Sequence, residues 1–169
     1  MKEEIKKLIS LLCDVVDKLG KAIGKENYHI EVATEMLEYM MYLSMADDEI
    51  EWTEILKIGL YLGFTDLNPQ NIEDYIIEHR IGSEKFENTI PTIFKILVDH
   101  DNMVYAKNPS NKKFLSEIMT IVYKALGKEL VESDGEVDKY EYSNFYTYDK
   151  LLNDYLDQKL LARASNKNS

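Results

Sequence analysis

Apolar residues recur at spacings of three and four along most of this chain, which is the pattern of amphipathic helices. The first such run predicts a helix over residues 2–19 that ends at Gly20. The second predicts a helix over residues 28–45, and its apolar face is broad enough to indicate a central, well-covered helix. A third helix is expected to begin near Trp52 and to stop near Gly63.

The rest of the chain continues this helical pattern. Asn68 and Pro69 form a helix start, with Asn as the N-cap and Pro at the first helical position, and this helix is expected to end near Gly82. The remaining apolar spacings predict helices from Thr89 or Pro91 to near Met103, over residues 114–130, and over residues 138–162. The pattern predicts an all-α fold, with residues 1–163 forming one domain and residues 164–169 a disordered tail.

Two acidic turns, residues 46–54 and 133–141, share one pattern at a constant spacing. Asp47 and Asp134 are 87 positions apart, and the aliphatic residue that follows each turn lies at the same offset. The chain therefore predicts two diverged copies of a helix, acidic turn, helix unit, related by a pseudo-two-fold arrangement. These units span about residues 28–64 and 111–151.

Helix capping explains much of the acid content of these turns. Asp138 followed by Glu141 fits a capping box, and carboxylates are favoured near the positive end of a helix. Gly135 supplies the left-handed conformation that a tight turn needs.

A metal site is the alternative explanation. Carboxylates that are held close together repel and raise one another's pKa, and a hard cation such as Ca²⁺, Mg²⁺ or Mn²⁺ relieves that cost. A self-sufficient calcium loop is not expected, because its first ligand position would fall on Leu43 or Leu130. A site shared between the two turns would use Asp47, Glu49, Glu54, Asp134, Glu136 and Glu141.

Residues 46–54 and 133–141 resemble the acidic turns of the TerB family of tellurite-resistance-associated proteins and its TerB-like superfamily. The resemblance implies a compact α-helical fold with internal duplication and a divalent cation held by the paired turns. It also implies a role in stress response or as an accessory to membrane-associated and signalling complexes. The metal residues that it implies are Asp47, Glu49, Asp134 and Glu136, followed by Glu54 and Glu141. The sequence departs from the family pattern at Asp48, where glycine is usual, and at Glu51 and Asp138, where serine is common.

Composition narrows the classes of partner. The 31 acidic and 20 basic residues give a formal net charge of −11, which disfavours nucleic acid and anionic lipid and favours cations or basic protein surfaces. No stretch approaches the ~20 apolar residues of a membrane span. Cys13 is the single cysteine, so no internal disulfide forms, and it is expected to pack as a small apolar residue. These features predict a cytoplasmic protein without direct membrane insertion.

Other candidates for chemistry are few. The sequence lacks phosphate-loop, nucleophile-elbow and zinc-finger motifs, so no enzyme activity is predicted. Asp99, His100 and Asp101 are expected to form a solvated cluster at a helix end. The aromatic residues between 140 and 155 surround their helix, so about half are expected in the core and the rest at an interface with a protein partner.

The sequence therefore predicts a non-catalytic, TerB-like, cation-responsive adaptor. Two alternatives stay open. One is a purely structural protein-interaction domain in which the acidic turns only cap helices. The other is a hydrolase that uses the carboxylates with a metal-bound water.

Overall fold

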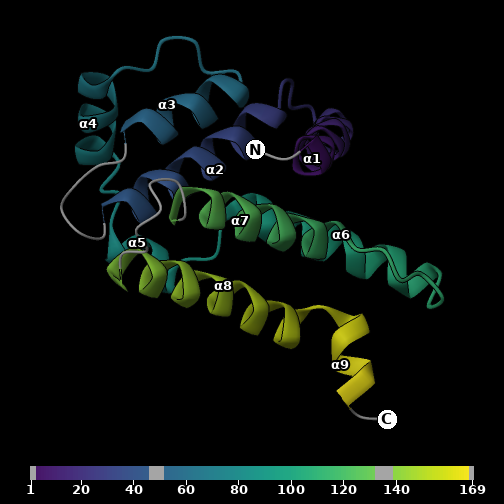
Figure 1. Ribbon diagram of the computed structural model, residues 1–169. Coiled ribbons are helices and arrows are strands. Elements are labelled where there is room, and N and C mark those ends of the chain that lie inside the picture. The colour runs from purple at the N-terminus through teal and green to yellow at the C-terminus, as the bar shows by residue number, and fades with distance from the viewer. Residues whose placement is uncertain (1–2, 46–51, 132–138, 168–169) are drawn as a thin grey trace.

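In the computed structural model, which describes residues 3–45, 52–131 and 139–167, the chain folds into helices (Figure 1), with no strand in these ranges. In chain order the helices are α1 (Glu3–Ala22), α2 (His29–Ser44), α3 (Trp52–Tyr61), α4 (Pro69–Glu78), α5 (Ser83–Asn88), α6 (Thr92–Lys107), α7 (Leu115–Val131), α8 (Lys139–Lys159) and α9 (Leu161–Lys167). The predicted all-α class is confirmed. None of these helices is long and apolar enough to cross a membrane.

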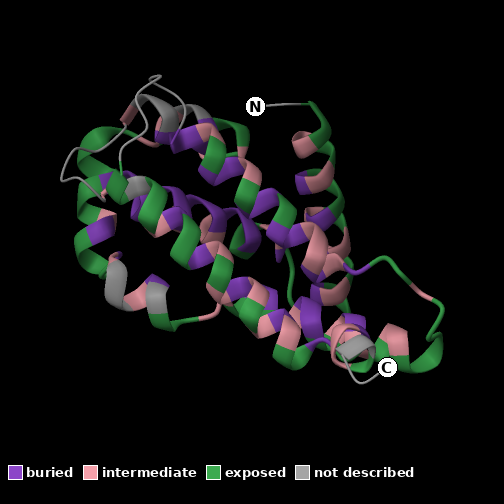
Figure 2. Cartoon of the chain, turned by 60° about the horizontal axis from the view of Figure 1, so that its bottom comes forward, coloured by how far each residue is buried: buried purple, intermediate pink, exposed green. Residues whose placement is uncertain are grey.

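The centre of the molecule is formed by α2 and α7. Helix α2 contacts α1, α3, α5, α6, α7 and α8, and α7 contacts α1, α2, α6 and α8. Figure 2 shows buried residues gathered toward the middle of the bundle and exposed residues on the outer faces. The prediction of a well-covered second helix is confirmed, and the methionines Met36, Met40 and Met41 of that helix are buried in the core.

Helix α1 ends later than the sequence pattern predicts, because a glycine further along the chain supplies its C-terminal cap. Gly24 has a positive φ of 76°, and the Lys25 N–H donates to the Gly20 carbonyl at 2.9 Å. This is the Schellman arrangement, in which the left-handed position follows the last helical turn. The predicted end at Gly20 is wrong, because Gly24 takes that position and the helix continues to Ala22. Gly20 instead lies under Tyr28, whose Cβ would be 2.6 Å from a Cβ at position 20.

Four features of the chain from α5 onward also differ from the predictions. The short helix α5 is not indicated by the sequence pattern, and α6 begins after Pro91, as predicted, but continues to Lys107. The single long helix expected over residues 138–162 is interrupted at Leu160, where α8 gives way to α9. Residues 164–167, which we expected in a disordered tail, belong to α9.

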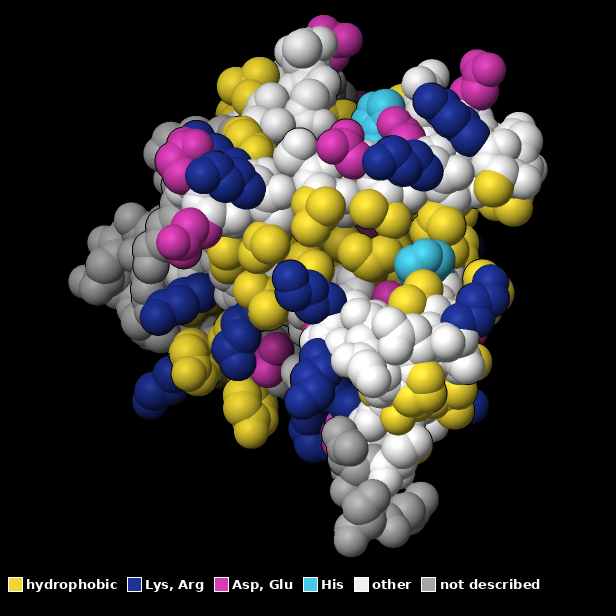
Figure 3. Space-filling model, turned by 90° about the vertical axis from the view of Figure 1, so that its right-hand side faces the viewer, with side chains coloured by type: hydrophobic (Ala, Val, Ile, Leu, Met, Phe, Trp, Pro, Cys, Tyr) yellow, Lys and Arg dark blue, Asp and Glu magenta, His cyan; other side chains and the backbone are white. Residues whose placement is uncertain are grey.

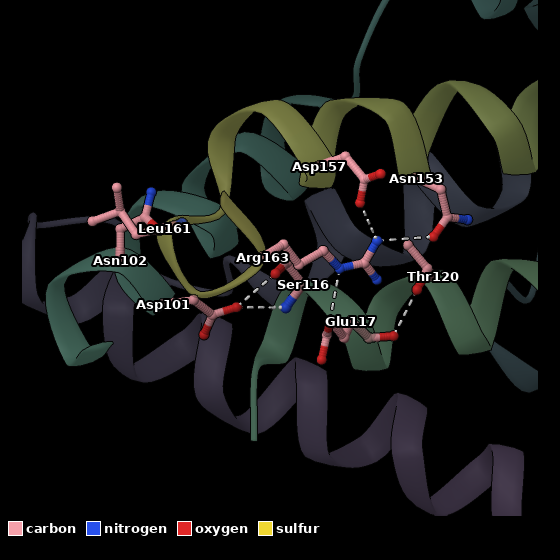
Figure 4. A network of polar contacts seen from close by, with 9 residues as sticks. All are labelled: Asp101, Asn102, Ser116, Glu117, Thr120, Asn153, Asp157, Leu161 and Arg163. Carbon is pink, nitrogen blue, oxygen red and sulfur yellow. Dashed lines mark hydrogen bonds and ion pairs between the residues drawn. The ribbon is translucent and has the colours of Figure 1, made fainter. Parts of the chain in front are cut away.

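A network of polar contacts joins α6, α7, α8 and α9 (Figure 4). Asn102 of α6 donates to the Lys159 carbonyl at 2.9 Å and accepts from the Leu161 N–H at 2.8 Å, on the two sides of the interruption. Arg163 of α9 donates to the Glu117 carboxylate of α7 at 2.9 Å. These contacts fix the direction of α9 relative to the bundle.

Asp101 belongs to the same network, and the predicted solvated cluster is wrong for this residue. The side chain of Asp101 is buried, and it accepts hydrogen bonds from the Leu115 N–H at 3.1 Å, the Ser116 N–H at 2.8 Å and the Ser116 hydroxyl at 2.7 Å. The first N–H groups of a helix have no acceptor within the helix. A carboxylate from α6 therefore caps α7, while Asp99 is exposed and His100 is half-buried.

Positions that the 87-residue repeat pairs do not all share an environment. Ile58 and Phe145 are both buried, whereas Tyr61 is exposed and Tyr148 is buried. The internal duplication therefore stays a prediction.

The surface on the side where α1, α6 and α9 lie carries both signs of charge. Figure 3 shows a band of hydrophobic side chains across the middle of this face, with Lys or Arg and Asp or Glu side chains on both sides of the band.

Candidate functional site

Two glutamates of α2 lie next to cavities. Glu35 and Glu38 are three positions apart, so they project from the same side of the helix. Because other helices surround α2, the side chain of Glu38 is only 13% exposed. Glu38 lines two cavities, and Glu35 lines the smaller of them.

The larger cavity lies between α2, α4 and the segment that connects α3 to α4. Its volume is about 440 Å³, which lies within the range of roughly 300–1,000 Å³ that is typical of pockets for organic ligands. The apolar residues that line it are Leu37, Met41, Phe64, Leu67 and Ile72. Such walls favour an occupant with an apolar body.

Local hydrogen bonds hold the wall that α4 contributes. The Asn71 N–H donates to the Asn68 side chain at 3.1 Å, and the Asn68 N–H donates to the Asn71 side chain at 2.8 Å. This capping box, with Pro69 at the first helical position, confirms the predicted start of α4. The Asn71 amide also donates to the Asp66 carbonyl, which ties the connecting segment to the helix.

Glu38 is fully engaged by its neighbours. The Tyr75 hydroxyl of α4 donates to one carboxylate oxygen at 2.9 Å, and Lys85 Nζ of α5 donates to the other at 2.8 Å. Burial, followed by the hydrogen bond to Glu38, raises the pKa of Tyr75. Glu38 therefore links α2 to both α4 and α5 where the two cavities adjoin.

The smaller cavity has a volume of about 190 Å³ and lies between α2, α5, α8 and the segment before α6. Its charged and phenolic groups belong to Glu35, Glu38, Lys85 and Tyr148. The Glu35 carboxylate accepts from the Ile93 N–H at 3.1 and 3.3 Å, so it caps α6 from α2. Burial raises the pKa of Glu35 to about 7, against the lowering effect of the backbone N–H groups at the start of α6.

Aromatic rings pack tightly beside this cavity. The Tyr39 ring lies 4.7 Å from the Tyr148 ring and 5.0 Å from the Tyr123 ring, between centroids. Burial raises the pKa of all three phenols well above the usual value. The hydroxyls of Tyr123 and Tyr148 perturb each other's pKa, but within the described residues neither has a partner in hydrogen-bond geometry.

The aromatic residues of α8 divide between core and surface, as predicted. Phe145 and Tyr148 are buried, whereas Tyr140, Tyr142 and Tyr146 are exposed. The exposed tyrosines lie in the first half of the helix.

The predicted metal residues are not placed by this structure. Asp47, Glu49, Asp134 and Glu136 lie outside the described residues. Glu54 lies in α3 and Glu141 in α8, but the structure describes only their backbone. Among the side chains that are described, no group of three or more His, Cys, Asp or Glu could hold a metal ion.

Cys13 packs against the core and is half-buried. Burial, assisted by the charges of Asp17 and Asp14, raises the pKa of its thiol to about 11. The thiolate that a nucleophilic role requires is therefore scarce at neutral pH.

Comparison with protein-family models, curated proteins and solved structures finds no match to this chain. The resemblance to the TerB family stays a prediction from residues 46–54 and 133–141. The described geometry defines an all-α protein with two cavities that adjoin at Glu38. Sequence reasoning missed Glu35 and Glu38, although two acids three positions apart in a broadly apolar helix were a usable signal.

Proposed function

We propose that the chain is a non-catalytic module that binds a small organic ligand with an apolar body in the larger cavity. The observation that carries the proposal is the cavity of about 440 Å³, whose lining combines apolar side chains with polar groups such as Glu38 and Tyr75. Apolar walls supply most of the binding free energy, at roughly 25 cal/mol per Å² of buried apolar surface. The Tyr75 hydroxyl donates its hydrogen to Glu38, so its oxygen can accept a hydrogen bond from one end of the ligand and orient it.

A ligand in this cavity would touch α2, α4 and the segment between α3 and α4 at once. Binding to the folded state alone raises the free energy of unfolding as the ligand concentration exceeds its dissociation constant. Ligand binding to the proposed module would thus hold α4 in place against α2 and stabilise the folded state.

The proposal is tested with N-phenyl-1-naphthylamine, a neutral apolar probe whose fluorescence rises in an apolar site. We expect saturable binding with one probe per chain. Thr34 is half-buried and lines the cavity, so Thr34→Phe should fill it and weaken probe binding at least tenfold. Thr147→Phe is the matched control, because Thr147 is exposed on α8 and outside both cavities. Equal loss in both variants, or no saturation, would refute the proposal.

A TerB-like, cation-responsive adaptor is the second candidate. Its support is that α2 and α7, which precede the two acidic turns, end on the same side of the molecule, where α8 begins (Figure 1). The exposed Tyr140, Tyr142 and Tyr146 of α8 offer a surface for a protein partner just after the second turn. An ion shared by the turns would then couple divalent-cation binding to the angle between the helices.

Thermal unfolding of chelator-treated protein, titrated with Ca²⁺, Mg²⁺ and Mn²⁺, tests the second candidate. A cation site predicts a saturating, ion-selective rise in stability that is lost when Asp134 and Glu136 are changed to Asn and Gln. A flat response would leave helix capping as the role of the acidic turns.

A further inference from the structure

The charged residues that line the larger cavity have only one sign. Its described lining contains two charged residues, Glu38 and Asp66, and both are acidic. No Lys, Arg or His is among the described residues that line it. The cavity therefore offers a ligand negative charge and hydrogen-bond acceptors, but no cationic side chain that could bind an anion.

The two acids are in different environments. The side chain of Glu38 is 13% exposed and pairs with Lys85 at 2.8 Å, so its charge is largely balanced. Asp66 is exposed, and within the described part of the chain its carboxylate has no ion-pair partner. Asp66 thus leaves one unbalanced negative charge where the lining of the cavity meets solvent.

Asn71 connects Asp66 to the wall that α4 forms. The Asn71 amide donates to the Asp66 carbonyl, and Asn71 and Tyr75 are four positions apart, so they lie on one face of α4. The Tyr75 hydroxyl donates to Glu38 at 2.9 Å, which leaves the hydroxyl oxygen as an acceptor. This side of the cavity therefore presents an acceptor and an unpaired carboxylate, and both favour a ligand that donates hydrogen bonds and carries positive charge.

We propose that the ligand of the larger cavity is an amphiphilic amine, in which an ammonium group is joined to an apolar body. The proposal rests on the ligand-binding function proposed above and names the class of ligand. The apolar body lies against Leu37, Met41 and Ile72. The ammonium group is attracted to Asp66 and donates a hydrogen bond to the Tyr75 hydroxyl oxygen. Because Asp66 is exposed, the charged group stays near solvent and avoids the cost of burying a charge in an apolar cavity.

Two other classes of ligand fit this lining less well. A fatty acid or another carboxylate would meet Asp66 without a cation to bind it, because Lys85 lines the smaller cavity alone and is engaged by Glu38. A neutral alcohol can donate to the Tyr75 oxygen but gains nothing from the charge of Asp66. The net charge of −11 also attracts cations to the molecule. The expected order of affinity is thus ammonium, then alcohol, then carboxylate.

Three probes with the same eight-carbon chain test this order: octylammonium chloride, 1-octanol and sodium octanoate. The cavity volume of about 440 Å³ corresponds to roughly 15 water molecules at about 30 Å³ each, so such a chain fits. Titration calorimetry with the full chain at pH 7, below the micelle concentrations, measures each affinity. A solvent-exposed ion pair changes an affinity by up to about fivefold. Attraction of one probe and repulsion of the other should therefore make octylammonium bind roughly tenfold more tightly than octanoate.

Asp66→Asn removes the charge on which the proposal depends. It should weaken octylammonium binding by about two- to fivefold, strengthen octanoate binding and leave 1-octanol binding unchanged. Glu73→Gln is the matched control, because Glu73 is an exposed acid of α4 that lines neither cavity. It should change each affinity by less than about 1.5-fold, since exposed charges that lie apart are largely screened by salt. Equal effects of the two variants would assign the preference to general charge and overturn the proposal.

Thr34→Phe locates the bound probes. Because it fills the larger cavity, it should weaken the binding of octylammonium and 1-octanol at least tenfold. Adsorption of a cation to the acidic surface would survive this substitution. Octylammonium binding that is unchanged in Thr34→Phe would therefore overturn the proposal.

The neutral probe N-phenyl-1-naphthylamine separates failure of this proposal from failure of the proposed function. Saturable binding of that probe, with octanoate bound as tightly as octylammonium, would overturn the amine class and leave the proposed function standing. The same holds if octylammonium does not displace the naphthylamine. Absence of saturable naphthylamine binding would refute the proposed function, and the amine proposal with it.

Discussion

The carboxylate of Asp101 accepts a hydrogen bond of 2.7 Å from the hydroxyl of Ser116, and the two residues lie on different helices, α6 and α7. The same carboxylate accepts the backbone N–H groups of Leu115 and Ser116. One buried side chain therefore satisfies three donors at the start of a central helix. The position of α7 relative to α6 depends on it.

Asp101→Ala should lower the free energy of unfolding by about 3 kcal/mol, because it removes a cap and leaves buried donors without an acceptor. Asp101→Asn should lower the free energy of unfolding less, because its side-chain amide oxygen can still accept some of these hydrogen bonds. Urea unfolding at pH 7 measures both. Asp99→Ala is the control, because Asp99 is exposed, and it should change stability by less than ~0.5 kcal/mol. A loss in Asp101→Ala no larger than in Asp99→Ala would contradict this role.

Features that are set by residues close together along the chain could be predicted from the sequence. The capping box of Asn68 and Asn71, the start of α6 after Pro91 and the burial of α2 are encoded within single segments. The cap that Asp101 places on α7 and the cap that Glu35 places on α6 join residues 14 and 58 positions apart. No local pattern signals such pairs, since they exist only once the helices pack.

The cavities and the end of α8 were beyond prediction for the same reason. The larger cavity needs α2, α4 and the segment before α4 in place together. The interruption at Leu160 is held by Asn102 of α6, which bonds backbone groups on both sides of it. Periodicity alone continues the helix through that point, because Leu156 and Leu160 are both buried at helical spacing.

Gly127 of α7 should not tolerate a larger side chain. A Cβ at this position would lie 2.4 Å from the Tyr39 hydroxyl oxygen and 2.6 Å from Phe145 Cδ2. Both neighbours are buried, so neither can move freely. Alanine normally stabilises an exposed helical position by about 1 kcal/mol relative to glycine. Here the overpacking should dominate, and Gly127→Ala should cost about 1–3 kcal/mol.

Chemical denaturation measures this effect, with Gly82→Ala as the matched control. Gly82 has extended backbone, with a φ of 169°, and no described atom lies within 4 Å of a Cβ built there. Gly82→Ala should therefore be nearly neutral. A stabilising Gly127→Ala would show that α7 can move away from α2 and α8 without cost.

Tyr148→Phe should be neutral or stabilising. The hydroxyl of Tyr148 is buried and lacks a described partner, so its removal relieves a desolvation cost while the ring contacts to Tyr39 and Phe86 remain. We expect a gain of up to ~1 kcal/mol in urea unfolding. Tyr146→Phe on the same helix is the control, because Tyr146 is 62% exposed. A clear loss in Tyr148→Phe alone would mean that the hydroxyl is satisfied in solution.

The stability of the protein should fall as the pH rises from about 4.5 to about 7, because Glu35 has a raised pKa in the folded state. Burial raises the pKa of its carboxyl from 4.5 to about 7. The folded state therefore holds the proton more tightly than the unfolded state, and the stabilisation is complete below pH 4.5. It is lost as the pH passes through the folded-state pKa, and the loss is on the order of 3 kcal/mol.

Glu35→Gln removes this titration while keeping an oxygen for the Ile93 N–H. Urea unfolding at pH 5, 6, 7 and 8 should show that wild type loses stability relative to the variant across this range. Asp17 does not interfere, because the hydrogen bond from the His29 N–H lowers its pKa below the usual 3.8, outside this window. Glu31→Gln should parallel wild type. Parallel curves for wild type and Glu35→Gln would instead mean that water reaches Glu35 and keeps its pKa near the ordinary value, because a solvated carboxylate has no desolvation cost to raise it.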